Sequence, residues 1–439
     1  MDASSSQLIE SKVASWLELY LSEGSNYTPN TADLMALQSE HAAKHYAYDD
    51  VVMSRRNGMY LTDSEGRECI DGNGTYSACA DPDNVFTLGA TAFRQILKLT
   101  HVQNKFLNEQ QPLLLELLDN VSGLPVAVFM NSGAEAFDTV VKASRRYGYR
   151  VKGVKKNKAK IIVAKRNFHG RTLCAISASS ERKYQEDFGP LVPGFIKIAF
   201  GDIAALEKYV SRPDVVAFIV EVVQGEGGVH IANQHYWRAV QALCAKHNVL
   251  IVFDEVQTGL GRTGALFCHQ HYGLTPDMMM LAKAFAQVLP ASAVLGKKHI
   301  MDIAFEPGSH GSTFGGNPVS CAVARKSIEL IMAKRDLGDG ITGSLVENSR
   351  DVGGYLLDQL KDALRNNPNV IDIRGKGLLI GIELNKKLIT CEYLRQKTRD
   401  KLLIGGAAGS NTYRLSPPLT AQRKHADEMT SIVVESLPY

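Results

Sequence analysis

Short runs of apolar residues alternate with amphipathic stretches between residues 126 and 295 of this 439-residue chain. Several of the runs are apolar throughout, as expected for strands that are buried on both faces of a parallel sheet. The pattern therefore predicts an α/β fold with a mostly parallel sheet. The expected strands are 127–130, 160–164, 195–199, 215–223, 249–253 and 291–295, and helices fit 134–148 and 236–247.

The flanking segments have a different texture. Residues 58–71 contain two short strands around an Asp-Ser-Glu-Gly turn, which is typical of a hairpin. After residue 320 we expect a smaller α+β domain with helices over 317–335 and 344–366, strands over 370–374 and 378–384, and a closing helix from residue 421. An amphipathic helix over 7–22 is expected to pack on this chain or on a second subunit. The predicted division is an N-terminal segment (1–80), a large domain (81–325) and a C-terminal domain (326–439).

Composition excludes several classes of function. The net charge of +3 comes from 49 basic and 46 acidic side chains, which gives no electrostatic footprint for nucleic acid, and the basic run 152–160 fits a solvated loop. No apolar run reaches the roughly 20 residues of a membrane span. The seven scattered cysteines show neither a disulfide framework nor the spacing of a metal site. The N-terminus lacks the pattern of a secretory signal, so we expect a cytoplasmic protein.

The six residues from Asn131 to Ala136 follow an apolar strand and open a helix. Ser132 with Glu135 three residues later fits a capping box, and Gly133 lets the backbone approach a ligand closely. The free N–H groups of a helix N-terminus favour an anion such as a phosphate. A plain structural helix explains the same residues, so this motif alone leaves both interpretations open.

Two charged residues stand in apolar surroundings further along the chain. Asp254 ends the run 249–253, and ligands of α/β sheets lie beyond the carboxyl ends of the strands. Its carboxylate needs a partner, either a protonated ring nitrogen of a cofactor or an Arg or Lys side chain. Lys283 follows five apolar residues. A desolvated lysine there would be a nucleophile, whereas a surface lysine with a buried stem fits the same segment.

These three features, taken together, favour one cofactor. A phosphate cradle, a strand-end aspartate and a buried lysine, in this order on an α/β sheet, are the parts of a pyridoxal phosphate site. The lysine binds the cofactor aldehyde, and the aspartate keeps the pyridine nitrogen protonated so that the ring takes up electrons from a carbanion. We therefore expect pyridoxal 5'-phosphate as the cofactor.

Longer motifs connect these features, and together they resemble one family. The chain is similar to the class III aminotransferases of pyridoxal phosphate fold type I, and most of all to the ornithine δ-aminotransferases, from about residue 46 to the C-terminus. The resemblance implies a large domain with a mostly parallel seven-stranded sheet and a smaller α+β domain formed by the N- and C-terminal segments. The motifs are NSGAEA (131–136), NFHGRTLCAIS (167–177), FGPLVPGF (188–195), EVVQGEGG (221–228), FDEVQTGLGRTG (253–264), LAK (281–283), HGSTFGGNP (310–318) and RLSPPL (414–419).

The resemblance implies a role for each cofactor contact. Lys283 matches the lysine that binds the cofactor and then moves a proton between the substrate and cofactor carbons. Asp254 matches the partner of the pyridine nitrogen. The other implied contacts are Gln257 at the ring hydroxyl, Phe168 stacked on the ring with His169 beside it, Ser132, Gly133 and Ala134 at the phosphate, and Thr313 with Ser312. Thr313 matches a phosphate contact donated by a second subunit. The resemblance therefore implies a homodimer, or a higher oligomer, with its active site at the subunit interface.

The resemblance also implies how small amino acid and 2-oxo acid substrates are bound. Arg171 matches the arginine that holds the α-carboxylate of ornithine, and its planar fork suits a carboxylate. Tyr46 and Tyr76 match tyrosines that line the ornithine pocket. Glu226 and Arg414 match a gate pair: paired, they admit an ω-amine, and when Glu226 swings away Arg414 can grip the α-carboxylate of glutamate or 2-oxoglutarate. A structural ion pair is the alternative for each of these residues.

The sequence departs from the family pattern around the expected pocket and its entrance. The family's glycine-rich turn after the lysine is replaced by residues 284–290, and its Gly-His-x-His-Pro stretch by residues 79–83. Val222 stands in place of a proline, and His169 in place of the tryptophan that follows the stacking aromatic. The residues implied in the chemistry are all present.

The predicted function is transfer of the δ-amino group of ornithine, or of a close ω-amino acid, to 2-oxoglutarate. The products from ornithine would be glutamate and glutamate semialdehyde, which cyclises to pyrroline-5-carboxylate. One alternative is another class III ω-aminotransferase acting on acetylornithine, 4-aminobutyrate, lysine or a diamine. A racemase or epimerase on the same fold is a second alternative. A non-enzymatic subunit is the third, and it predicts the loss of a cofactor residue, which the sequence does not show.

Overall fold

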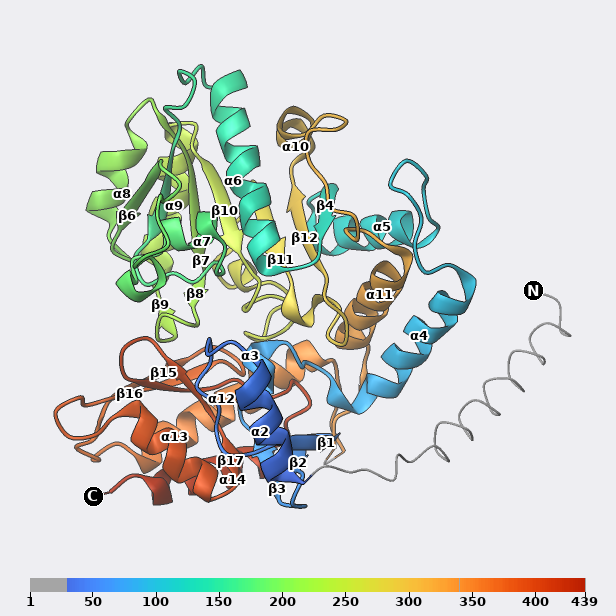
Figure 1. The fold of residues 1–439 in the computed structure, drawn as a ribbon. Coiled ribbons are helices and arrows are strands. Elements are labelled where there is room, and N and C mark those ends of the chain that lie inside the picture. The colour runs from blue at the N-terminus through green and yellow to red at the C-terminus, as the bar shows by residue number, and fades with distance from the viewer. Residues whose placement is uncertain (1–29, 339, 439) are drawn as a thin grey trace, which may run out of the picture. The chain divides into compact units, whose positions relative to one another are not determined.

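The computed structural model describes residues 30–338 and 340–438, which form two compact units (Figure 1). The helix predicted over 7–22 lies outside the described residues. The described part of the smaller unit comprises residues 30–55 and 61–68. It contains α2 (Thr31–His41), which is capped by the side chain of Asn30, and most of β1 (Met53–Asn57) and β2 (Tyr60–Asp63). The expected turn after β2 is closed by the N–H of Asp63, which donates to the carbonyl of Arg67 at 3.1 Å.

The larger unit is built on a seven-stranded sheet with the order β4-β12-β11-β10-β7-β5-β6. Neighbouring strands are parallel except for β12, which runs antiparallel to both neighbours. The mostly parallel sheet is thus confirmed, and the one strand absent from the six predicted runs is β11, in which three of the four residues are methionines without β-branching. The strands are β4 (Val126–Met130), β5 (Lys160–Ala164), β6 (Phe195–Ile198), β7 (Val215–Glu221), β10 (Leu250–Asp254), β11 (Met278–Leu281) and β12 (Ser292–Gly296).

Helices cover both faces of this sheet, which explains why its central strands are apolar throughout. On one face, α6 (Gly133–Arg150) and α10 (Lys298–Ala304) share a core with Ile219 of β7. On the other face, α8 (Ile203–Val210) and α9 (Gln234–Lys246) share a core with Phe218. Neighbouring residues of one strand belong to different cores because successive side chains point to opposite faces.

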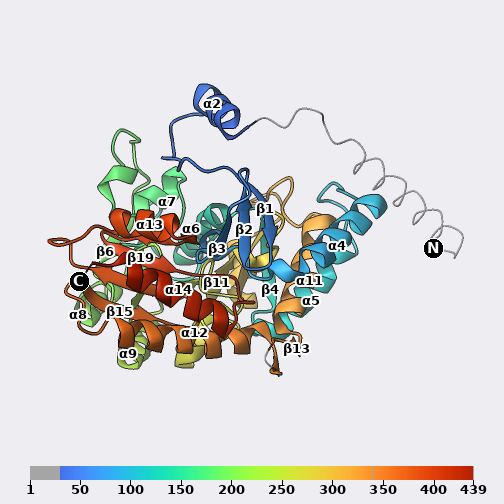
Figure 2. The same cartoon turned by 90° about the horizontal axis from the view of Figure 1, so that it is seen from below.

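The C-terminal part of the larger unit forms a second, antiparallel sheet with the order β15-β16-β19-β18. Figure 2 shows α12, α13 and α14 in the same region as this sheet. Nearby, Ile70 of β3 (Glu68–Asp71) pairs with Leu403 of β17 (Leu403–Ile404), so a segment from near the N-terminus joins the C-terminal residues. The elements are β15 (Val370–Gly375), β16 (Ile380–Leu384), β18 (Gly406–Ala408), β19 (Thr412–Leu415), α12 (Leu345–Ala363), α13 (Cys391–Asp400) and α14 (Arg423–Ser436).

The remaining helices border the large sheet or connect it to the C-terminal part. The long connecting helix α11 (Pro318–Met332) was expected, whereas α4 (Val85–Lys98) and α5 (Gln110–Ser122), which pack against it, were not. None of the helices in residues 30–338 and 340–438 is long and apolar enough to cross a membrane. The shorter elements are α3 (Gly74–Ser77), α7 (Leu173–Ala178), β8 (Val223–Gln224), β9 (His230–Ile231), β13 (Arg335–Asp336), β14 (Thr342–Gly343) and 3₁₀ turns at 82–84, 182–184, 268–272 and 283–285.

The surroundings of two helix glycines, one in α6 and one in α12, predict opposite effects of alanine substitution on stability. A Cβ atom on Gly148 of α6 would lie 2.2 Å from Cγ1 of Val216 in β7, whereas Gly354 of α12 has no such neighbour within 4 Å. We expect Gly148→Ala to lower the free energy of unfolding by about 1–3 kcal/mol, because an overpacked core must shift. Gly354→Ala should raise it by about 0.5–1 kcal/mol, because alanine loses less entropy in a helix. Denaturant titration measures both, and equal effects would contradict the packing.

Candidate active site

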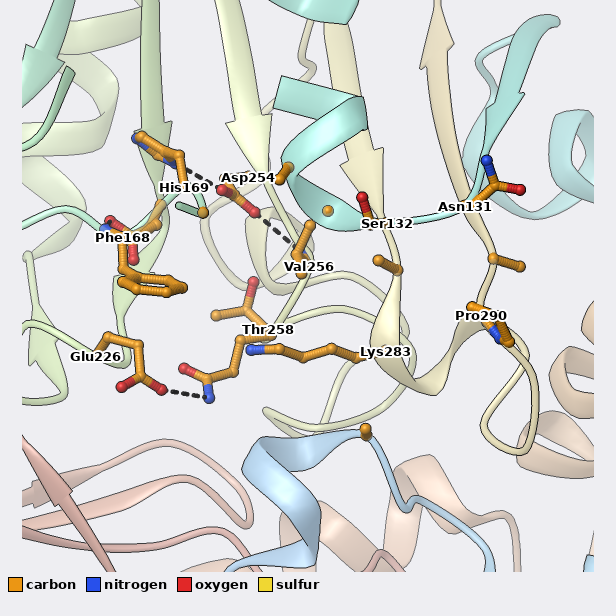
Figure 3. Close-up of a pocket in the computed structure, with 18 of the residues that line it drawn as sticks. Asn131, Ser132, Phe168, His169, Glu226, Asp254, Val256, Thr258, Lys283 and Pro290 are labelled. Carbon is orange, nitrogen blue, oxygen red and sulfur yellow. Dashed lines mark hydrogen bonds and ion pairs between the residues drawn. The ribbon is translucent and has the colours of Figure 1, made fainter. Parts of the chain in front are cut away.

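A cavity of about 420 Å³ lies where the carboxyl ends of β7 and β10 meet the first turn of α6 (Figure 3). Ligands of open α/β sheets bind at such strand ends, and the volume suits a small cofactor or substrate. The lining residues come from segments far apart in the sequence. They include Ser132, Gly133, Ala134, Phe168, His169, Glu226, Asp254, Gln257 and Lys283.

The N-terminus of α6 forms one end of the cavity. Ser132 caps the helix, with its Oγ accepting from the N–H of Glu135 at 3.2 Å. The expected capping box is only half formed, because the carboxylate of Glu135 accepts from the N–H of Asn131 (2.9 Å) and not from that of Ser132. The amides of Gly133 and Ala134 belong to the first turn, which has no intrahelical acceptors for its N–H groups. This end of the cavity therefore suits an anion.

Asp254 stands at the end of β10 and is almost fully buried. One carboxylate oxygen lies 2.6 Å from Nδ1 of His169, and the other accepts from the N–H of Val256 at 3.0 Å. His169 is itself held in place, since its ring stacks on Phe137 with centroids 4.6 Å apart. The partner of Asp254 in this chain is thus a histidine, and the alternative of an Arg or Lys ion pair is wrong.

Lys283 follows β11 in a 3₁₀ turn, and Figure 3 shows its side chain extending into the cavity. Burial is the largest influence on Lys283 and lowers the pKa of its amine, although the nearby carboxylate of Glu226 acts in the opposite direction. The interpretation as a surface lysine is therefore wrong. Its backbone φ of +50° is unusual for a residue other than glycine, and such strain concentrates at functional sites.

The two members of the expected gate pair meet in the structure. Nη1 of Arg414 donates to Oε1 of Glu226 at 2.5 Å, and the arginine is fully buried. The ring of Tyr76 lies beside this pair, 5.8 Å from Cζ of Arg414. Gln257 joins the cluster because its Nε2 donates to the backbone carbonyl of Tyr76 at 3.2 Å. A Cβ atom on Gly225 would lie 1.6 Å from Oε1 of Gln257, so this glycine makes room for the amide.

Arg171 lies on aromatic rings, and no carboxylate of the described residues forms an ion pair with it. Its Cζ is 3.8 Å from the ring centroid of Tyr184 and 5.5 Å from that of Phe168. Tyr184 was not anticipated, because nothing in the sequence pattern links it to Arg171. Cation–π contacts of this kind hold a guanidinium in place while leaving its edge available for an anion.

Three predicted residues lie outside this arrangement. Ser312 accepts from Nδ2 of Asn131 at 2.8 Å, next to the helix cap, while Thr313 does not line the cavity of its own chain. Tyr46 belongs to the smaller unit, where its ring contacts those of His45 and Tyr48. The roles expected for these residues stay predictions.

Glu221 is a cavity residue for which no role was predicted. It ends β7 and pairs in register with Asp254, so the two carboxyl groups stand side by side. Burial and the neighbouring Asp254 raise the pKa of Glu221 well above its ordinary value. The signal was present in the sequence, because Glu221 ends an apolar strand just as Asp254 does.

A left-handed turn presents Tyr76 to the site. Gly74, Thr75, Tyr76 and Ser77 have φ values of +54°, +52°, +56° and +73°. Left-handed conformation costs roughly 1–2 kcal/mol for each residue with a side chain. Only the glycine could have marked this turn in the sequence.

The fold and the cavity define a class of protein: the α/β architecture, the anion site, the strand-end aspartate and the lysine are those of the fold type I pyridoxal phosphate enzymes. The family model of the class III aminotransferases matches residues 41–437. The chain belongs to this family and is a pyridoxal-phosphate-dependent aminotransferase.

Individual relatives agree with this assignment. An ornithine aminotransferase of Plasmodium falciparum (isolate 3D7) is 38% identical over 415 residues, which cover 93% of this chain and 97% of the relative. The solved ornithine aminotransferase of Toxoplasma gondii, described with pyridoxal phosphate at its active site, is 32% identical with a TM-score of 0.87, over 96% of this chain and 97% of that one. An acetylornithine aminotransferase of Elizabethkingia anophelis is 34% identical with a TM-score of 0.82, over 93% of this chain and 99% of that one.

The raised pKa of Glu221 predicts a pH dependence of stability. The folded state holds this proton more tightly than the unfolded state, so its contribution is complete below the ordinary pKa of about 4.5 and is lost as the pH rises through the folded value. Glu221→Gln removes this titration. The melting temperature of the variant minus that of the wild type should therefore increase from pH 5 upwards. Thermal unfolding of the holoenzyme at fixed cofactor concentration measures it.

The exposed Glu207 of α8 offers a matched control. Glu207→Gln should shift the melting temperature by an amount that does not grow with pH in this way. A difference for Glu221→Gln that stays constant with pH would contradict a raised pKa of Glu221.

Proposed function

We propose that this aminotransferase moves the δ-amino group of ornithine to 2-oxoglutarate, giving glutamate and glutamate semialdehyde, which cyclises to pyrroline-5-carboxylate. The observation that carries the proposal is the contrast between two arginines. Arg414 is neutralised by Glu226, whereas Arg171 lies against aromatic rings in the described part of the chain. An amino acid with one carboxylate and a distal amine needs one available cation, and Arg171 supplies it. The names of the relatives in Plasmodium and Toxoplasma support the same substrate.

The residues of the cavity fit pyridoxal 5'-phosphate. The first-turn amides of Gly133 and Ala134, with the Ser132 hydroxyl, suit its phosphate. Asp254, fixed by His169 and by the N–H of Val256, suits its protonated pyridine nitrogen. We assign the ring hydroxyl to Gln257 and the ring face to Phe168. When bound, the cofactor supplies an electron sink for the carbanion formed on the substrate.

Lys283 is the residue that we assign to covalent attachment and proton transfer. Its lowered pKa leaves a larger share of the amine neutral and able to accept a proton at the substrate carbon. The same amine can return that proton to the cofactor carbon.

The gate pair lets one site serve both half reactions. While Glu226 holds Arg414, the α-carboxylate of ornithine is directed to Arg171 and the distal amine reaches the cofactor. Glutamate and 2-oxoglutarate carry two carboxylates, so the second half reaction needs both arginines. We infer that Glu226 leaves Arg414 during that half reaction. Tyr76, beside Arg414, and Tyr46 are assigned to the ornithine pocket.

Acetylornithine is the alternative donor with an observation in its favour, since an acetylornithine aminotransferase has a similar fold and sequence. Acetylornithine has the same α-carboxylate and distal amine as ornithine. It differs from ornithine only by the acetyl group on the α-amine. Comparing the rates of the two donors in the first half reaction separates these functions.

We also propose a homodimer in which Thr313 contacts the phosphate in the site of the second subunit. Exposed apolar side chains support an interface, and the loop after α4 lies against this segment, since Nδ2 of Asn104 donates to the carbonyl of Ser312 at 2.9 Å. These apolar side chains are Phe86 and Leu97 of α4, Phe106 and Leu107 after it, and Phe314.

The described residues include all seven cysteines, and none forms a disulfide, which supports a reducing compartment such as the cytoplasm.

Arg171→Ala tests the substrate assignment. Arg171 is exposed, so removing its charge-assisted contact to the substrate carboxylate should lower kcat/KM for ornithine by about tenfold or more, because hydrogen bonds to charged groups contribute roughly 1.5–3 kcal/mol. The measurement is a single turnover with ornithine alone, followed by the visible absorbance of the bound cofactor and by trapping of pyrroline-5-carboxylate with o-aminobenzaldehyde.

Arg182→Ala, at an exposed position of the same segment, is the control and should leave this rate unchanged. If wild-type enzyme turns over ornithine but Arg171→Ala does so equally well, Arg171 does not hold the carboxylate. If the wild type does not react with ornithine, the proposed donor is wrong.

Subunit complementation tests the shared site. Lys283→Ala homodimers should be inactive, and Thr313→Ala homodimers should hold the cofactor more weakly. A mixed dimer combines one Lys283→Ala subunit with one Thr313→Ala subunit. It has one site with both residues intact only if Thr313 contributes to the site of the other subunit. Reassembled mixtures should therefore recover activity, up to about a quarter of the wild-type value from equal statistical pairing of two chains. Activity no higher than the average of the two homodimers would contradict the shared site.

A further inference from the structure

A second cavity, of about 520 Å³, adjoins the active site, and Phe168 and Glu226 line both. Glu226 thus stands on the boundary between the two spaces. The charged groups and the histidine on the walls of the second cavity are, besides Glu226, Arg166, Lys183, His230, Lys386, Glu181 and Glu383. The carboxylate of Glu383 is already paired with Arg374 at 2.6 Å.

Arg166 occupies an unusual position on the wall of this cavity. Its φ is +63°, a conformation that costs energy for a residue with a side chain. Its backbone N–H donates to Oγ of Ser180 at 2.8 Å, and Nη1 of its guanidinium lies 3.2 Å from Nε2 of His230. Within the described part of the chain, no carboxylate lies within 4 Å of this guanidinium.

The backbone places Arg166 close to the gate residue. A Cβ atom on Gly227, the residue after Glu226, would lie 2.4 Å from the carbonyl oxygen of Arg166. The backbone of Glu226 is fixed on its other side, because its carbonyl accepts from the N–H of Gly409 at 2.7 Å. Movement of Glu226 is therefore a rotation of its side chain.

Release of Glu226 leaves two charges that need partners. Arg414 is fully buried, and its Nε and Nη2 have no hydrogen-bond partner among the described residues, so a substrate carboxylate must replace Glu226 there. The released carboxylate of Glu226 also needs a cation, since a partly buried unpaired charge is costly.

We propose that Arg166 is the alternate partner of Glu226: when a dicarboxylic substrate occupies Arg414, the Glu226 side chain turns into the second cavity and pairs with the Arg166 guanidinium. This inference rests on the proposed function, in which Arg414 binds the dicarboxylate. The guanidinium fork suits a carboxylate better than an ammonium does.

The other cationic or basic groups of the second cavity are weaker candidates. Lys183 lies over the ring of Tyr184, with its Nζ 5.4 Å from the centroid. Burial and the nearby Arg374 and Arg166 lower the pKa of His230, which disfavours its charged form. Lys386, which follows β16, carries an ammonium, which suits a carboxylate less well than the guanidinium fork of Arg166.

Arg166→Gly tests the proposal, because glycine adopts the same φ without strain and the variant should fold. In the holoenzyme, kcat/KM for the half reaction with glutamate should fall about fivefold, the worth of a partly exposed ion pair. Binding of glutarate, an unreactive dicarboxylate, measured by calorimetry should weaken by the same factor. The half reaction with ornithine should change less than twofold, and Arg166→Lys should recover part of the loss.

Two control variants distinguish loss of the ion pair from a backbone effect and from a general effect of charge. Asn157→Gly changes another residue at positive φ (+62°), before β5 and so at the opposite end of this strand from Arg166, and should leave both half reactions unchanged. Lys386→Ala removes a charge from the same cavity. An equal loss in Lys386→Ala would show a general effect of charge and overturn the proposal.

If Arg166→Gly lowered kcat/KM equally for glutamate and ornithine, or changed neither value, the proposal would also be overturned. The glutamate half reaction and glutarate binding do not involve ornithine. A wild-type enzyme that reacts with glutamate but not with ornithine therefore contradicts the proposed donor, while the test of Arg166 stands.

Discussion

The arrangement of the site depends on the buried carboxylate of Asp254 at the end of β10. Its two oxygens are satisfied by His169 and by the N–H of Val256, so the group is held in one orientation without a cation of the chain. Parallel strands bring their carboxyl ends to one edge, and the register puts Glu221 directly beside it. Burial, and after it the neighbouring carboxylate of Asp254, disfavour a negative charge on Glu221 and raise its pKa.

The gate pair obeys a similar constraint. Arg414 is completely buried and Glu226 is its carboxylate partner. Breaking a buried ion pair by removing one partner costs roughly 3–5 kcal/mol, because it leaves an uncompensated charge. Simple opening of the gate would therefore be rare. Exchange of one carboxylate for another at Arg414 avoids this cost, provided that Glu226 also finds a cation. The gate is therefore an exchange of partners. The number of carboxylates on the substrate decides whether Arg414 pairs with Glu226 or with the substrate.

The sequence predicted the sheet better than the details of the site. Strands that are apolar throughout were recognisable because both of their faces are covered by helices, and β11 was missed because it is short and rich in methionine. Lys283 and Asp254 were recognisable as charges in apolar surroundings. The contact between Arg171 and Tyr184 was not, because it depends on how a loop folds back. Glu221 could have been found, because it ends the apolar strand β7 just as Asp254 ends β10.

Backbone strain marks the site in a way that the sequence cannot show. Asparagine and aspartate tolerate positive φ, but bulkier residues do so only where the surrounding structure enforces it. Three such residues line the two cavities, Lys283 and Gln287 the first and Arg166 the second, and Tyr76 contacts the gate. Each carries a side chain where glycine would be more stable. The energy that this strain costs, roughly 1–3 kcal/mol per residue, is offset by the large core of the sheet. Tyr76, Lys283 and Arg166 direct their side chains to the gate or to a cavity, whereas Gln287 also holds the fold together, since its amide oxygen accepts from the N–H of Asp81 (2.7 Å) and its Nε2 donates to Oγ of Ser327 (2.8 Å).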